Sequence, residues 1–589
     1  MTEVSGSSRT RHLEGRIEPQ SAYPWLKSYP SGVDWAQSFE PKLIGSMLDS
    51  AVAAYGKRPC IYFMGKRLSY HELGALADRA AKGLQALGVG PGVKVGLLLP
   101  NAPTAPLFYY GVLKAGGTVV NFNPLYSLEE IEFQIRDSGT EIMVTLDLEL
   151  TFDKVEAMLS RRVLDHAVVA SFASLLPPLK SLGLKVLRGP RLAQVEKSPE
   201  RERIVLEAEL MANDGGYERP DISTDAVAVL QYTGGTTGTP KAAMLTHANI
   251  SINAAQVTAW MNRRPTENDR VLGVLPLFHV FAMTAVMNLG ITQGMELILL
   301  PKFELIDTLK LIHKLRPTVM PGVPTLFNAI MRYPRIRNFD ISSLEFCLSG
   351  GAPLPIEVKR GFEALAGCHL VEGYGLSETS PVATCNPLDR EPREGSIGLP
   401  LPGTEISIRS LEDASVEMPI GEAGEVCIAG PQVMPGYWNK QEETDASFSG
   451  RFFRTGDVGY MDEDGFVFIV DRIKDMINCS GFKVYPRRIE EALYEHPAVA
   501  EATVIGIPDP YRGEAPKAFI KLKEGSKARE GELMEYLKER FSKIELPAEI
   551  EFRDELPKTM IGKLSKKELR AAHSAHGKPK AERNSFRNS

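Results

Sequence analysis

The sequence predicts an α/β protein in which a large N-terminal domain of mixed sheets layered with helices precedes a small, mobile α+β domain. Three observations support this prediction. The chain has 589 residues, and at about 100–200 residues per domain it should form more than one packed unit. Apolar, strand-like runs alternate with helical patterns through most of the chain. Near residue 470 a charged connector is followed by a shorter set of helix and strand signals.

The first clear helix is predicted in SYHELGALADRAAKGLQALG, which begins at Ser69. Ser69 and Glu72 have the spacing of a capping box, apolar residues follow at helical intervals, and Gly88 is suited to end the helix. The runs KVGLLLP, GGTVVNFNP and EIMVTL, which come next, each indicate a buried strand. Buried strands separated by amphipathic helices are typical of a largely parallel sheet.

The composition excludes several classes of protein. A net charge of −6 is mild for this length and argues against a general nucleic-acid binder. The six cysteines form no CxxC pair, which favours reduced thiols in the cytoplasm over a disulfide framework or a zinc site. The polar N-terminus lacks the apolar core of a signal peptide. Residues 271–295 contain no Asp, Glu, Lys or Arg, but Gly, Pro, His and amide residues interrupt them, so we expect a buried strand, turn and helix rather than a membrane span.

These patterns divide the chain into five parts. We predict an N-terminal extension at 1–40, a large domain at 41–471, a hinge at 471–474, a mobile domain at 475–573, and a basic, disordered tail at 574–589. The alternative for the hinge is that its charged residues form only a surface turn.

The glycine-rich segment QYTGGTTGTPK, which ends at Lys241, has a strand pattern on each side and a helical pattern after it. Glycines allow consecutive N–H groups to point into one concavity, threonine hydroxyls add donors, and the lysine adds a mobile positive charge. The segment therefore predicts a cradle for a polyphosphate. It is not a Walker A loop, because Thr239 and Pro240 separate Gly238 from Lys241, and it is not GxGxxG. A flexible glycine turn is the alternative interpretation.

Further segments carry candidate chemistry. In EGYGLSET, Tyr374 can stack on a flat base and Glu378 is an oxygen ligand suited to Mg²⁺. Asp457 can accept hydrogen bonds from both hydroxyls of a ribose, and Arg472 can bind ribose or phosphate oxygens. Taken singly, Glu378 is better explained as a solvated surface acid, and His279, in LPLFHVF, as a core histidine bonded to a backbone carbonyl. No acid near His279 could pair with an ammonium group, so an aliphatic carboxylic acid suits this segment better than an amino acid.

The segment 232–241 resembles the YTGGTTGxxKG signature of the AMP-forming acyl-CoA synthetases in the adenylate-forming superfamily, with Ala242 in place of the usual glycine. The segments EGYGLSETSPVATCNP, GSIGLPLPGTE, GPQVMPGYWNK and DRIKDMI are most similar to bacterial long-chain fatty-acid–CoA ligases, as is YPWLKSYPSGVDW near the start. The resemblance covers about residues 40–573. The sequence also departs from the family pattern at 478–479 and 560–561. These differences would affect catalytic efficiency and acyl-chain preference more than the type of reaction.

The resemblance also implies roles for individual residues. The implied nucleotide-binding residues are Thr233, Gly234, Gly235, Thr236, Thr237, Gly238, Lys241, Gly350, Gly351, Ala352, Glu372, Gly373, Tyr374, Gly375, Ser377, Asp457, Ile469 and Arg472. The implied catalytic residues are Lys241, His279 and Lys563, and the implied Mg²⁺ ligands are Thr236 and Glu378. Gly481 and Lys483 are implied in CoA binding, and Lys474 is implied as the hinge residue.

The implied reaction is ATP-dependent activation of a fatty acid, expected to be long-chain, to acyl-AMP and pyrophosphate, followed by transfer to coenzyme A with release of AMP. ATP and the acyl group would bind the large domain, and movement of the small domain would exchange Lys563 for the face around Gly481. The alternatives are a medium-chain or aryl ligase, an enzyme that loads a carrier protein, and a catalytically silent lipid- or nucleotide-binding protein. The missing GK[ST] argues against a P-loop phosphohydrolase.

We further expect small-molecule substrates, no nucleic-acid partner, and a monomer or homodimer in the cytoplasm. Residues 557–580 include seven Lys or Arg residues and only one acidic residue. This excess of positive charge suggests contact with CoA phosphates or with the anionic inner face of the membrane. A solvated basic tail is the alternative.

Overall fold

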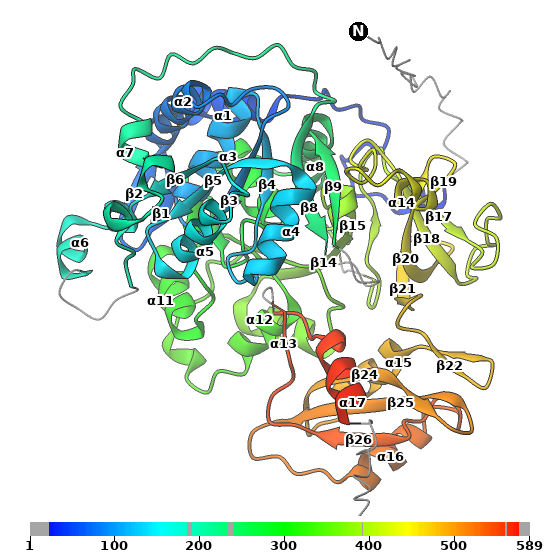
Figure 1. The fold of residues 1–589 in the computed structure, drawn as a ribbon. Helices are drawn as coiled ribbons and strands as arrows, with labels where there is room; N and C mark the ends of the chain where they lie inside the picture. Colours follow the sequence, from blue (N-terminus) through cyan, green and yellow to red (C-terminus); the bar gives the residue numbers. More distant parts are fainter. Residues whose placement is uncertain (1–22, 185–190, 234–239, 391–392, 560–561, 577–589) are drawn as a thin grey trace, which may run out of the picture.

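The computed structural model describes residues 23–184, 191–233, 240–390, 393–559 and 562–576. The described chain forms two large sheets and two smaller ones. Figure 1 shows the large sheets with their helices in the upper part of the view and the last sheet, coloured orange to red, in a separate unit below. The predicted combination of a large mixed-sheet domain and a small α+β domain is therefore confirmed.

The first large sheet has seven strands and is parallel except at one edge. In spatial order its strands are β7 (Ile204–Leu206), β6 (His166–Ala170), β5 (Thr140–Leu146), β3 (Lys94–Leu98), β4 (Thr118–Asn121), β8 (Val227–Thr233) and β9 (Lys241–Thr246). The edge strands β8 and β9 are antiparallel, with Thr233 opposite Lys241. The predicted strands on both sides of the glycine-rich loop are thus confirmed, and hydrogen-bonded strands fix both ends of the loop.

The second large sheet has nine strands, and its central strands are parallel. In order they are β16 (Leu399–Pro400), β15 (Val382–Cys385), β14 (His369–Gly375), β13 (Phe346–Ser349), β12 (Val319–Gly322), β10 (Arg270–Gly273), β11 (Glu296–Leu299), β1 (Pro59–Phe63) and β2 (Lys66–Ser69). The carboxyl ends of β12, β13 and β14 lie at one edge, where open α/β sheets bind ligands. The predicted nucleotide-binding residues at 350–352 directly follow β13, and the segment EGYGLSET, at 372–379, begins within β14 and continues beyond it.

Helices surround these two sheets (Figure 1). They are α1 (Ile44–Tyr55), α2 (Tyr70–Ala86), α3 (Thr104–Ala115), α4 (Leu128–Ser138), α5 (Glu149–Ser160), α6 (Pro178–Leu184), α7 (Glu207–Leu210), α8 (His247–Met261), α11 (Leu305–Leu315), α12 (Pro324–Met331) and α13 (Ile356–Ala366). The predicted capping box begins α2: the Glu72 N–H donates to Ser69 Oγ at 3.2 Å, and the Ser69 N–H donates to Glu72 Oε2 at 2.7 Å.

The uncharged segment 271–295 forms β10, a turn and a broken, buried helix, as predicted. The helix consists of α9 (Val280–Ala282), a π-helical stretch at Met283–Asn288, and α10 (Leu289–Thr292). Within the described ranges, no helix is long and apolar enough to cross a membrane.

The third sheet is antiparallel and comprises β17 (Glu405–Arg409), β18 (Gly424–Ala429), β19 (Phe448–Ser449), β20 (Phe452–Met461) and β21 (Val467–Arg472), beside α14 (Gln441–Ala446). The described part of the predicted N-terminal extension packs against it. Trp25 is 2% exposed, and a Cβ on Gly465 would lie 2.2 Å from its Cα, so only glycine fits at that contact. The remainder of the extension lies outside the described residues.

The small unit has its own sheet of β22 (Ile477–Cys479), β23 (Phe482–Val484), β24 (Val499–Asp509), β25 (Gly513–Leu522) and β26 (Glu549–Phe552). Its helices are α15 (Pro486–Glu495), α16 (Glu530–Lys538) and α17 (Lys566–His576). Its apolar side chains form a core separate from the cores of the large domain. The change of sheet between β21 and β22 coincides with the predicted hinge, while the boundaries at 41–471 and 475–573 stay predictions. Most of the predicted tail lies outside the described residues.

Candidate active site

The glycine-rich loop is described only at its ends. Gly234, Gly235, Thr236, Thr237 and Gly238 lie outside the described residues. Thr233 closes β8, and its hydroxyl donates to the Lys241 carbonyl oxygen at 3.3 Å. Lys241 begins β9, and its ammonium nitrogen lies 5.2 Å from the centroid of the Tyr437 ring.

The turn after β13 contains Gly350, Gly351 and Ala352. The Gly350 N–H donates to the Gly322 carbonyl oxygen at 3.1 Å, which ties the ends of β12 and β13 together. Gly351 has φ +79°, a conformation that favours glycine. The turn is thus fixed at the carboxyl end of β13.

Glu372 stabilises this turn from inside the protein. Its carboxylate accepts a hydrogen bond from the Leu354 N–H at 3.3 Å and is buried, and burial raises its pKa to about 7. Its observed partner is thus protein backbone, which indicates that Glu372 shapes the turn on which a nucleotide would lie.

The segment that follows contains Gly373, Tyr374, Gly375 and Ser377. Gly373 and Tyr374 pair with β15, and Ser377 starts a single 3₁₀ turn. A Cβ on Gly375 would lie 1.8 Å from the Pro381 carbonyl oxygen, so no other residue fits there without a backbone shift. The Tyr374 hydroxyl donates to Asp457 Oδ2 at 2.6 Å, which links this segment to the third sheet.

Asp457 and Arg472 lie opposite each other on β20 and β21, and the Arg472 Nε is 3.1 Å from Asp457 Oδ1. Ile469 lies on β21 as well and is partly buried. The Asp457 carboxylate is nearly inaccessible to solvent, and both of its oxygens are engaged, by Arg472 and Tyr374. A ribose at this position would share or replace these two contacts.

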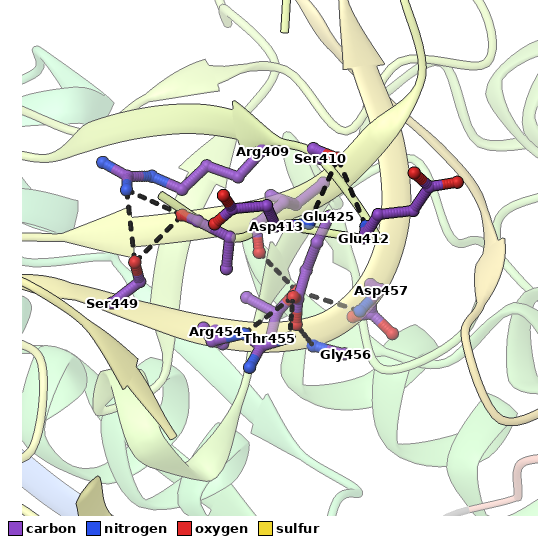
Figure 2. Close-up of polar contacts among 12 residues, drawn as sticks. Arg409, Ser410, Glu412, Asp413, Glu425, Ser449, Arg454, Thr455, Gly456 and Asp457 are labelled. Atoms are coloured by element: carbon purple, nitrogen blue, oxygen red, sulfur yellow. Dashed lines mark hydrogen bonds and ion pairs between the residues drawn. The ribbon is translucent and has the colours of Figure 1, made fainter. Parts of the chain in front are cut away.

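Figure 2 shows how the strand before Asp457 is held. Glu425 forms an ion pair with Arg454 at 2.8 Å and accepts a hydrogen bond from the Gly456 N–H at 3.0 Å. The Thr455 hydroxyl accepts a hydrogen bond from the Asp457 N–H at 3.0 Å. The backbone of Asp457 is therefore fixed by side chains of β18 and β20 rather than by a ligand.

Lys563 reaches this site from the small unit. A Cβ on Gly351 would lie 2.6 Å from Lys563 Cε, and the Thr325 hydroxyl holds the lysine loop by donating to the Gly562 carbonyl oxygen at 2.7 Å. Burial, with the positive charge of Arg472 as a second cause, lowers the pKa of Lys563 to about 8. The lysine is therefore mostly charged at neutral pH.

His279 lies close to the same ammonium group. Burial, reinforced by the positive charge of Lys563, lowers the His279 pKa to about 3, so the ring is neutral at physiological pH. The Phe281 N–H donates to His279 Nδ1 at 3.3 Å, which assigns the ring proton to Nε2. His279 can thus donate one hydrogen bond to an oxygen atom in the site.

Glu378 suits a divalent cation that is shared with a phosphate. It is 8% exposed, burial raises its pKa, and Oε1 accepts a hydrogen bond from the Tyr437 hydroxyl at 2.8 Å. No group of three or more His, Cys, Asp or Glu side chains in the described part of the chain could hold a metal alone. A single buried carboxylate fits Mg²⁺, which commonly takes one or two carboxylates plus substrate phosphates.

The predicted CoA-binding residues lie elsewhere. Gly481 and Lys483 belong to the exposed β22–β23 hairpin, beside Phe482, which is 61% exposed. Lys474 follows β21, and its charge contributes to the lowered pKa of Lys563. The structure therefore brings His279, Gly351, Asp457, Arg472, Lys474 and Lys563 together, and it leaves Gly481 and Lys483 on the outside of the small unit.

Two residues of the site have no predicted role. Thr325 docks the loop of Lys563, and Tyr437 contacts both Lys241 and Glu378. Tyr437 lies in GPQVMPGYWNK, a segment that the sequence singled out without a function. Two adjacent aromatic residues between a glycine and an asparagine could have marked this segment as a candidate site. For Thr325 the sequence offers no such signal except its position after a buried strand.

Comparison with known proteins decides the family. The family described as AMP-binding enzyme matches residues 48–438, and the AMP-binding enzyme C-terminal domain matches residues 488–563. The chain belongs to the AMP-binding enzyme family. Within this family it is an adenylate-forming acyl-CoA ligase, which confirms the resemblance stated from the sequence.

This AMP-binding enzyme is similar over nearly its whole length to characterised relatives. It is 42% identical over 563 residues to a long-chain-fatty-acid–CoA ligase of Bacillus subtilis, covering 93% of this chain and 98% of that protein. It is 36% identical over 557 residues to the long-chain-fatty-acid–CoA ligase of an Escherichia coli strain, covering 93% and 97%. The crystal structure of ATP-bound MatB from Rhodopseudomonas palustris matches with a TM-score of 0.79 at 29% identity, covering 92% of this chain and all of that one.

Proposed function

We propose that this enzyme is a long-chain fatty-acid–CoA ligase that works in two steps: a fatty acid and ATP give acyl-AMP and pyrophosphate, and acyl-AMP and CoA give acyl-CoA and AMP. The observation that carries the proposal is the position of Lys563. Its loop extends from the small domain to Gly351, beside His279 and the Asp457–Arg472 pair. This arrangement suits the first step, in which two anions must approach each other.

In the first step, a carboxylate oxygen attacks the α-phosphorus of ATP and pyrophosphate leaves. The protein contributes mainly positioning and charge neutralisation. We assign Lys563 to the substrate carboxylate and the α-phosphate, and we propose that His279 Nε2–H donates a hydrogen bond to an oxygen of one of these two groups. Lys241 and its glycine-rich loop are assigned to the β- and γ-phosphates. Tyr374 and the Gly350–Gly351 turn would hold adenine, and Asp457 the ribose.

Mg²⁺, when bound, would neutralise phosphate charge and stabilise the leaving pyrophosphate. Glu378 is its candidate protein ligand among the described residues because it is buried and polar, with one oxygen oriented by Tyr437.

The second step needs a thiol at the same carbonyl carbon. The thiol sulfur attacks this carbon, and AMP leaves from it. In this structure the site is occupied by the Lys563 loop, and the Gly481 hairpin faces away. We propose that rotation of the small domain about Lys474 withdraws Lys563 and brings Gly481 and Lys483 to the site, with CoA as the acceptor.

A long acyl chain is supported by the names of the two similar relatives, both long-chain-fatty-acid–CoA ligases. We propose that its tail enters at a mostly apolar slot lined by Phe278, the residue before His279. The slot has a volume of about 10 Å³, no more than one water molecule needs, so it is closed to an acyl chain in this structure. It is lined by Leu97, Leu99, Ala105, Tyr109, Asn121, Leu277, Phe278 and Met287. A long chain would enter by separating these side chains.

Basic residues near the C-terminus give less support to membrane contact. Lys558, Lys566 and Arg570 already form ion pairs, with Glu501, Glu490 and Asp475 respectively. Peripheral membrane contact and a monomeric or homodimeric state stay parts of the proposal.

The test is pyrophosphate release and acyl-CoA formation with ATP, Mg²⁺ and CoA, across acetate, octanoate, palmitate, oleate and 4-coumarate. A maximum at palmitate or oleate supports the proposal. A maximum at a short or aryl acid would be consistent with the two-step reaction but would contradict the proposed preference for long acyl chains. Pyrophosphate release without acyl-CoA would identify a carrier protein as the acceptor, and no pyrophosphate with any acid would indicate a silent binding protein.

A further inference from the structure

Tyr437 lies on a short segment that extends the edge of the first large sheet. The Met244 N–H donates to the Gly436 carbonyl oxygen at 3.0 Å, and the Trp438 N–H donates to the Ala242 carbonyl oxygen at 2.9 Å. These bonds attach the segment to β9, the strand that begins with Lys241. The segment therefore moves with the strand that leaves the glycine-rich loop.

The same segment is attached to Glu378 at two points. The Met434 N–H donates to the Glu378 carbonyl oxygen at 2.8 Å, and the Tyr437 hydroxyl donates to Glu378 Oε1 at 2.8 Å. Glu378 is thus held through its backbone and its carboxylate by one segment. A fixed carboxylate loses less conformational freedom on binding a cation than a free one does.

The ring of Tyr437 contacts the lysine of the phosphate loop. The Lys241 ammonium nitrogen lies 5.2 Å from the ring centroid, within the range of a cation–π interaction. Tyr437 is 9% exposed, so this contact is largely shielded from water. One side chain therefore contacts both charged groups that are expected to face the phosphates.

The orientation of Tyr437 is set by protein contacts. The Tyr437 N–H donates to the Thr444 hydroxyl at 2.9 Å. A Cβ on Gly436 would lie 2.5 Å from Thr444 Cγ2, so the close approach to α14 depends on glycine at 436. The side chain is therefore positioned before any ligand binds.

We infer that Tyr437 is a positioning residue that couples the metal and phosphate subsites: its hydroxyl orients the Glu378 carboxylate, and its ring orients the Lys241 ammonium group. The inference rests on the proposed function, because it assigns Glu378 and Lys241 to Mg²⁺ and the phosphates of ATP. The two roles belong to different parts of one side chain, so one substitution can remove the hydroxyl alone and a second can remove the hydroxyl and the ring together.

The test is calorimetric titration of the full chain with MgATP and, in a second series, with ATP in the presence of EDTA. In Tyr437→Phe the ring stays and the hydroxyl is lost, so MgATP should bind about tenfold more weakly, as expected for one hydrogen bond to a charged group. Binding of metal-free ATP should change less than about twofold. In Tyr437→Leu the ring is lost as well, so metal-free ATP should also bind more weakly, by about threefold.

Tyr70→Phe is the matched control. It removes another buried tyrosine hydroxyl, which donates to the Met295 carbonyl oxygen at 2.8 Å, directly before β11 begins. Both titrations of this variant should match the wild type. If the loss of any buried tyrosine hydroxyl destabilises the fold, the melting temperature of Tyr70→Phe should fall as that of Tyr437→Phe does.

Two results would overturn the inference: equal loss of MgATP and metal-free ATP binding in Tyr437→Phe, or wild-type binding of both. Either result, with wild-type protein that binds MgATP and releases pyrophosphate, would leave the proposed function intact. Wild-type protein that binds no ATP would instead contradict the proposed function itself.

Discussion

At the scale of single residues, the structure gives several site residues protein partners where a ligand is expected. Asp457 is the clearest case, since Arg472 and Tyr374 engage its two oxygens. The candidate residues of the site were predicted from the sequence, Glu378 and His279 only through the family resemblance, because each taken singly fits a surface acid or a core histidine better. Their partners were not predicted: Tyr374, for example, lies 83 residues before Asp457, and no local pattern links the two.

Asp457→Asn should weaken ATP binding by about tenfold or more, because an amide cannot accept hydrogen bonds at both oxygen positions. The measurement is the KM for ATP in pyrophosphate exchange at saturating palmitate. Asp464→Asn, at an exposed ion pair with Arg393, is a suitable control and should leave this KM unchanged. A raised KM for palmitate alone would place Asp457 at the acyl group instead.

The lowered pKa of Lys563, about 8, predicts an alkaline limit to adenylation. The charged ammonium group is the form that neutralises the anions, and it is lost as pH rises through this value. The limit should appear in the pH profile of kcat/KM, because this constant reports the pKa of Lys563 in the free enzyme. In the profile of kcat the limit should lie at higher pH, because bound anions stabilise the charged ammonium group.

Lys563→Arg should have no alkaline limb in kcat/KM near pH 8, because arginine stays charged, even if its rate is lower. The profile should be measured with pyrophosphate release at low ATP. An alkaline limb that is unchanged in Lys563→Arg would assign the titration to another group.

At the scale of elements, local patterns in the sequence predicted individual helices and strands. The helix at 70–86, the helix at 247–261 and the strands flanking the glycine-rich loop all form where capping and alternation indicate. Contacts between elements were beyond such patterns. The segment beside β9 that carries Tyr437 is one example, because nothing in residues 434–438 specifies which strand they join.

The slot beside Phe278, as the proposed entry of the acyl tail, predicts control of chain length. Ala105, on α3, is 8% exposed and lines the slot, so the ring of Ala105→Phe, which is larger than the slot, should block its opening. We expect kcat/KM for palmitate to fall by about tenfold or more while the value for octanoate stays within about threefold, since each buried methylene contributes roughly 0.8 kcal/mol.

Octanoate serves as the internal control for folding and for the chemical steps in this variant. An equal loss for both acids would show a general defect, and an unchanged preference would exclude the slot as the place of the acyl tail.

At the scale of the whole molecule, the account depends on the small domain. The sequence predicted its existence and its hinge from a change of pattern near residue 470, but its docked position could not be predicted. One contact that holds this position is the hydrogen bond from the Thr325 hydroxyl to the Gly562 carbonyl oxygen. A domain with its own core, joined by a short connector, can change partners without unfolding.

The most direct test of the central claim is to measure the two half-reactions separately in Lys563→Ala and Gly481→Leu. Palmitoyl-AMP formation from ATP and palmitate reports the first step, and palmitoyl-CoA formation from supplied palmitoyl-AMP and CoA reports the second. Gly525→Leu is the control for strain, since its φ of +75° resembles the +87° of Gly481 and a Cβ meets open space at both positions.

Lys563→Ala should lose the first step by about a hundredfold or more, as expected for a group that stabilises transition-state charge, and should largely retain the second. Gly481→Leu should show the reverse pattern, and Gly525→Leu should retain both steps. If Lys563→Ala and Gly481→Leu each lose both half-reactions equally, the small domain does not alternate between the two steps, and the role assigned to Lys563 here is wrong.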